Sequence, residues 1–171
     1  MNVRQLSSRI LFIVGNVAMV AGALDLMEGS LLILPGSALV LLGTLISRTE
    51  RNFVAYRLSV FVLIAVGVAA FWRLNSLGGF GGNSGRSGWW GLMILPYLIG
   101  WSMAMWGPGS PRWLLVLGIL VGVFYEVMVF ALLKGPLKPG TMVIGVLGVA
   151  TIVGCIVRFI HRTPQPLPTI L

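Results

Sequence analysis

Six apolar runs constrain this chain more than any other feature, because each is close to the roughly 20 residues that a helix needs to cross a bilayer. The runs cover residues 10–26, 30–46, 56–72, 89–106, 113–133 and 141–159. Only 9% of the 171 residues are charged, against roughly a quarter in soluble domains, so the chain lacks the polar surface of a water-soluble fold. We therefore expect an all-α, polytopic transmembrane helical bundle of about six spans.

The basic residues lie mostly at the ends of the apolar runs, where such residues anchor helices and set their orientation. One set of alternate connections, counted with both termini, holds eight of them: Arg4, Arg9, Arg48, Arg51, Arg57, Arg112, Arg158 and Arg162. The other set holds four: Arg73, Arg86, Lys134 and Lys138. The positive-inside rule then places both termini in the cytoplasm and the protein in a cell (cytoplasmic) membrane. The lipid bilayer is the expected partner, and no nucleic acid is expected.

Residues 1–162 are expected to form a single transmembrane helical domain, followed by a Pro-rich cytoplasmic tail over residues 163–171. The first run has an alternative interpretation as a secretory signal, because arginines precede it and Ala21-Gly22-Ala23 resembles a cleavage site. Cleavage there would leave five spans and an outside N-terminus. The next run begins within a few residues and Asn16 interrupts the first run, so an uncleaved span is preferred.

Glu126 is the most informative residue, because an ionisable side chain inside a span is costly and normally faces the protein interior. Gly118, Gly122 and Glu126 recur every four residues and therefore share one helical face. The two glycines form a GxxxG pair, which lets a second helix approach closely. Gly145 and Gly148 lie at similar depth in the sixth run. We expect the fifth and sixth spans to pack tightly along these glycines.

The polar neighbours expected for Glu126 come from other runs. Tyr97 and Pro96 lie at nearly the same depth in the fourth run, and Pro35 is slightly shallower in the second run. A proline inside a helix removes one hydrogen bond and frees a carbonyl, so Pro35 and Pro96 are candidate helix kinks. A protonated Glu126 could donate a hydrogen bond to Tyr97 or to a carbonyl freed in this way.

Asp25 and Glu28, near the outer end of the first run, are candidates for the mouth of the same site. The functional interpretation is a proton or cation site in the outer half of the bundle. The candidate site residues are Glu126, Tyr97, Asp25 and Glu28. In the structural interpretation, which we favour, a protonated Glu126 is interhelical glue and the two outer acids stand in a turn.

Catalytic and metal chemistry find little support in the sequence. Cys155 and His161 are the only residues of their types, so no zinc or haem ligand set can be assembled from them. We predict no enzyme activity, no cofactor and no metal. Two classes of function remain. The first is a structural or accessory subunit that contacts other membrane subunits or copies of itself. The alternative is a small transporter or channel that uses an outer-half proton or cation site centred on Glu126.

Overall fold

The computed structural model describes residues 3–24, 29–47, 51–79, 88–132 and 139–161, and within them it contains helices and no strands. The elements are α1 (Val3–Leu24), α2 (Ser30–Ile46), α3 (Arg51–Ser76), the 3-10 helix η2 (Gly88–Ile94), α4 (Leu95–Trp106), α5 (Arg112–Leu132) and α6 (Pro139–Ile160). The predicted all-α class is confirmed, and the six α-helices of the described residues fit the six apolar runs. Three of them, α1, α3 and α5, are long and apolar enough to cross a membrane.

The helices extend beyond some of the apolar runs. Helix α3 covers Arg51–Ser76, whereas the apolar run covers residues 56–72, because polar residues such as arginine and asparagine continue a helix without breaking it. The helix ends in a Schellman motif. Gly78 has a positive φ of 85°, and the N–H groups of Gly78 and Gly79 donate to the carbonyls of Asn75 and Leu74. Hydropathy therefore locates this helix, and local capping sets its end.

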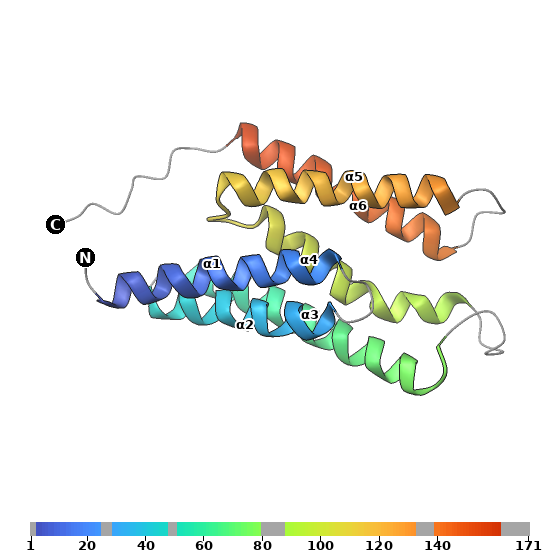
Figure 1. Ribbon diagram of the computed structural model, residues 1–171, viewed down its shortest axis with the longest axis horizontal. Helices are drawn as coiled ribbons and strands as arrows, with labels where there is room; N and C mark the ends of the chain where they lie inside the picture. Colours follow the sequence, from blue (N-terminus) through green and yellow to red (C-terminus); the bar gives the residue numbers. More distant parts are fainter. Residues whose placement is uncertain (1–2, 25–28, 48–50, 80–87, 133–138, 162–171) are drawn as a thin grey trace.

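The helices are arranged as three sequential pairs, α1 with α2, α3 with α4, and α5 with α6. In Figure 1, α5 and α6 lie side by side on one side of the bundle, α1 and α2 lie on the other, and the short helix α4 stands between them. Helix α4 contacts both α5 and α6. Helix α1 begins and α6 ends at the same end of the bundle (Figure 1).

Glycines let the paired helices approach at backbone distance. A Cβ atom at Gly15 would lie 2.6 Å from the carbonyl oxygen of Gly36, and a Cβ atom at Gly36 would lie 2.8 Å from that of Gly15. In the second pair, Gly67 of α3 meets the backbone of Tyr97. Such contacts replace side-chain packing with close backbone packing, which is the mode of association typical of helices in membranes.

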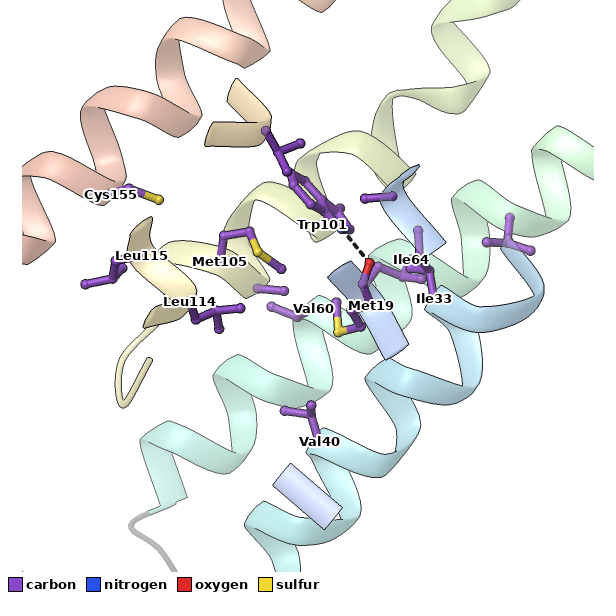
Figure 2. Packing of buried hydrophobic residues seen from close by; sticks show 14 residues of the cluster. Met19, Ile33, Val40, Val60, Ile64, Trp101, Met105, Leu114, Leu115 and Cys155 are labelled. Carbon is purple, nitrogen blue, oxygen red and sulfur yellow. Dashed lines mark hydrogen bonds between the residues drawn. The ribbon is translucent and has the colours of Figure 1, made fainter. Parts of the chain in front are cut away.

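The core lies around α4. Trp101 is buried at its centre, and its indole Nε1–H donates to the carbonyl of Met19 on α1 at 3.3 Å (Figure 2). Ile33 of α2, Ile64 of α3 and Met105 of α4 are fully buried in the same cluster. A tryptophan is suited to this position because its ring fills a large volume while its one donor finds a carbonyl.

A hydrogen bond between two buried hydroxyls joins α4 to α6. The hydroxyls of Ser102 and Thr151 are 2.8 Å apart, and the Thr151 hydroxyl is also 2.7 Å from the carbonyl of Leu147. One turn further along α4, the ring of Trp106 covers Gly154 of α6 and occupies the space of its missing side chain. These contacts fix α6 against the centre of the bundle.

Candidate functional site

The Glu126 side chain lies between α5 and α6, over a strip of α6 that carries no side chains. A Cβ atom added at Gly148 would collide with the Oε1 atom of Glu126, and one added at Gly145 would lie 3.9 Å from Oε2. The two glycines therefore leave the space that the carboxyl group occupies. Glu126 is half-buried as a whole, and the carboxyl enters the interface between the helices rather than the surroundings of the bundle.

The Oε1 atom of Glu126 is buried without a hydrogen-bond partner in the part of the chain that the structure describes. A buried polar atom left in this state costs about 1–3 kcal/mol relative to a paired one. The expected hydrogen bond from a protonated Glu126 to Tyr97 is therefore not formed through this atom. The interface therefore holds a buried carboxyl oxygen with no donor among the described residues.

Tyr97 packs on α3 through its backbone, whereas the Glu126 carboxyl lies against α6. The backbone and Cβ atom of Tyr97 pack on Gly67 of α3. The α5 residue that reaches α4 is Tyr125, whose ring stands edge-on to that of Trp101 with centroids 6.2 Å apart. Successive residues of a helix point about 100° apart, so α5 presents Tyr125 to α4 and Glu126 to α6. The predicted contact between Tyr97 and Glu126 is absent at the buried Oε1 atom, and it otherwise stays a prediction.

The two prolines also differ from the expectation that their kinks contribute carbonyls to the site. Pro96 is the second residue of α4, at its junction with η2, where a missing N–H costs nothing because first-turn N–H groups have no partner within the helix. Pro35 lies inside α2 but is exposed, and Leu31, whose carbonyl it would free, is exposed as well. Asp25 and Glu28, the other predicted site residues, lie outside the described residues.

The glycine faces of α5 and α6 meet, with partners that the spacing alone does not specify. A Cβ atom at Gly122 would lie 3.1 Å from the carbonyl oxygen of Gly148, and one at Gly148 would lie 3.3 Å from that of Gly122. Gly118 instead faces the sulfur of Cys155, which a Cβ atom would approach to 2.7 Å. Gly122 and Gly148 are thus the point of closest backbone approach, directly beside the Glu126 carboxyl.

One buried residue, Arg57, lies in the interior although the count of basic residues places it in a connection between helices. Arg57 of α3 is 3% exposed. Its Nη2 atom donates to the carbonyl of Pro108 at 3.1 Å, and its guanidinium lies 5.3 Å from the ring centre of Phe12 on α1. The Nη1 atom is buried without a hydrogen-bond partner among the described residues. The signal in the sequence is that Arg57 lies inside the apolar run, as the second residue of the range 56–72.

Comparison with protein families, with curated proteins and with solved structures finds no match for this chain. The functional proposals below therefore rest on the residues described above, chiefly Glu126, Gly148 and Arg57.

Proposed function

We propose that the protein is an integral membrane protein whose six helices span a cell (cytoplasmic) membrane. The observation that carries this proposal is the reversal of the usual distribution of polarity. Large apolar side chains cover the outside, with Phe130 75% exposed and Ile160 70% exposed, whereas Asn16 is fully buried. A water-soluble domain would bury the first kind and expose the last. In a bilayer the exposed apolar side chains contact lipid tails and need no polar coat.

The orientation that we propose places both termini in the cytoplasm. The end of the bundle at which α1, α3 and α5 begin, here termed the basic end, carries six of the arginines in the described residues: Arg4, Arg9, Arg51, Arg57, Arg112 and Arg158. The opposite end carries Arg73 in the same part of the chain. Such an asymmetry matches the excess of basic residues on the cytoplasmic side of membrane proteins.

Two measurements test membrane insertion and orientation. The protein should float with lipid vesicles and resist extraction by alkaline buffer, because its contact with the bilayer is apolar. Reporter fusions at Arg51 and at the C-terminus should report the cytoplasm, and a fusion at Gly82 should report the outside. Extraction into alkaline buffer would contradict insertion, and a mature N-terminus at Leu24 would contradict the six-span arrangement.

Within the membrane we propose a structural or accessory role, as a subunit that packs against other membrane proteins or copies of itself. The close glycine contacts within each helix pair support this role, because they make a rigid bundle. Purification in a mild detergent tests it. A stoichiometric membrane partner, lost together with the variant Gly122→Leu, would support an accessory subunit. A stable isolated oligomer with a hydrated interior would instead favour transport.

A second candidate is a transporter or channel with a proton or cation site at Glu126, and it is favoured by the unpartnered Oε1 atom beside Gly148. A hydrophobic carbodiimide reacts with protonated carboxyl groups in apolar surroundings, so it should modify Glu126 in the wild type and leave Glu126→Gln unmodified. Proton uptake into proteoliposomes, followed with an internal pH dye, should require Glu126 as well. Equal uptake by wild type and Glu126→Gln would exclude this candidate.

A further inference from the structure

The basic end of the bundle holds a buried positive charge for which the described residues provide no acidic partner. Arg57 is 3% exposed, and among the described residues its guanidinium bonds to the carbonyl of Pro108 and lies over the ring of Phe12. A guanidinium cannot lose its charge by deprotonation in a protein. Burying such a charge is costly unless an anion compensates it. One carbonyl and one aromatic face leave the Nη1 donors without an acceptor among the described residues.

The guanidinium of Arg57 is directed at the turn between α4 and α5. This turn is held against α3, since Gly107 packs on the ring of Tyr56 and Gly109, with a φ of +79°, lies beside the ring of Phe53. The Tyr56 hydroxyl donates to the carbonyl of Met103 at 2.7 Å. The aromatic side chains thus fix the turn, and the carbonyl of Pro108 within it receives the Arg57 donor.

Further positive charge surrounds this turn. Arg112 is the first residue of α5 and is exposed, and Arg158 of α6 is half-buried and near enough to Tyr56 to act on its hydroxyl electrostatically. The N-terminal end of a helix adds a partial positive charge, and acidic side chains in the first turn normally balance it. None of α1, α3 and α5 has an acidic residue in its first turn.

We propose that the basic end binds the phosphate group of an anionic phospholipid, with Arg57 as the inner contact and Arg112 and Arg158 as the outer contacts. Arginine matches phosphate oxygens in planar, two-point hydrogen bonds. The proposal rests on the proposed membrane insertion, which brings lipid phosphates to the level of the helix ends. It goes beyond that function because it names a lipid class and the side chains that select it.

The test uses the full chain purified in a nonionic detergent. Phosphatidylglycerol should raise its unfolding temperature and be retained in native mass spectra, whereas phosphatidylcholine and inorganic phosphate should do neither. Arg112→Gln should weaken the apparent affinity for phosphatidylglycerol about fivefold, because one basic side chain near an anionic surface contributes about 1 kcal/mol. Arg57→Gln, which removes the inner positive charge, should weaken it further. The matched control is Arg73→Gln at the opposite end of α3, which should leave the affinity unchanged.

Three results would overturn the proposal. Equal stabilisation by phosphatidylglycerol and phosphatidylcholine would show no selection for charge, and an equal effect of inorganic phosphate would assign the site to a free anion. An equal loss in Arg112→Gln and Arg73→Gln would show charge attraction without a site at the basic end. If Arg57→Gln does not fold, the difference in phosphatidylglycerol affinity between Arg112→Gln and Arg73→Gln still tests the proposal. Flotation of the same samples separates failure of this proposal from failure of membrane insertion.

Discussion

The carboxyl group of Glu126 fills the space over the backbone of Gly148 in which a Cβ atom at that position would have to stand. The two positions therefore depend on each other. An acid can lie in this interface only because α6 lacks a side chain there, and the absence of that side chain leaves no empty volume because the acid fills it. Close packing of this kind tolerates little added volume.

Gly148→Ala should accordingly destabilise the protein. The added methyl group must displace the Glu126 carboxyl or separate α5 from α6, and overpacking of this kind costs about 1–3 kcal/mol of unfolding free energy. Thermal unfolding in detergent measures the loss. The control is Gly145→Ala, where the nearest side-chain atom would be 3.7 Å away, an ordinary contact distance. Equal stability of the two variants would contradict the arrangement.

A substitution of Glu126 tests whether its carboxyl group contributes to the stability of the fold. Because Oε1 has no partner among the described residues, Glu126→Met, which keeps an unbranched side chain of similar length, removes a buried unsatisfied atom. We expect this variant to be at least as stable as the wild type. A loss of more than about 1 kcal/mol of unfolding free energy in chemical denaturation would show that the carboxyl stabilises the contact between α5 and α6, as the structural interpretation of the sequence predicts.

The closest backbone approach of α5 and α6 should not tolerate a large side chain. A Cβ atom at Gly122 would lie 2.6 Å from the Cγ1 atom of Ile152, so Gly122→Leu must push the two helices apart and reduce the dispersion contacts that hold them. The unfolding temperature should fall clearly. Val123→Leu, at the next and exposed position of α5, places a leucine side chain outside the interface and should leave the unfolding temperature nearly unchanged. A fall of similar size in both variants would argue against close contact at Gly122.

The hydroxyl pair between α4 and α6 makes a smaller contribution. Thr151→Val keeps the shape of the side chain and removes its hydrogen bond to Ser102. Interhelical hydrogen bonds in membrane proteins contribute about 0.6 kcal/mol on average, so a loss of that order is expected in reversible unfolding. Ser59→Ala is the control, because the exposed Ser59 hydroxyl bonds only to Ala55 of its own helix among the described residues. An equal effect of the two substitutions would mean that the pair does not stabilise the α4–α6 contact.

The sequence predicted the helices well, because hydropathy and spacing depend on one chain segment. The sequence predicts less well which residues of different helices lie next to each other. Counting along the helices predicts a similar depth for Tyr97 and Glu126, but it does not give the rotation of each helix about its axis, which decides the neighbours of each residue. Rotation is set by tertiary packing, here by Gly67 beneath Tyr97 and Gly148 beneath Glu126. A periodicity argument on one helix does not contain that information.

The position of Arg57 and the start of α4 were missed for other reasons. The charge count assigns Arg57 to a connection because it lies at the start of an apolar run, yet it is buried because α3 begins at Arg51, six residues earlier. Residues 89–94 were predicted as part of an apolar helix and form the 3-10 helix η2. Hydropathy does not distinguish the two helix types, and Pro96 marks their junction.

The hydrogen bond between Ser102 and Thr151 also bears on the order in which the protein is made. The two residues are 49 positions apart, so the ribosome finishes α4 well before the residue that pairs with Ser102 exists. Trp106 of α4 is likewise made before Gly154 of α6, on which its ring packs. Before α6 is made, α4 has contacts with α1 through Trp101, with α3 through Gly100 and with α5 through Met105. The last hairpin to emerge is therefore the one that completes the centre of the bundle, and a chain truncated before α6 would leave that centre open.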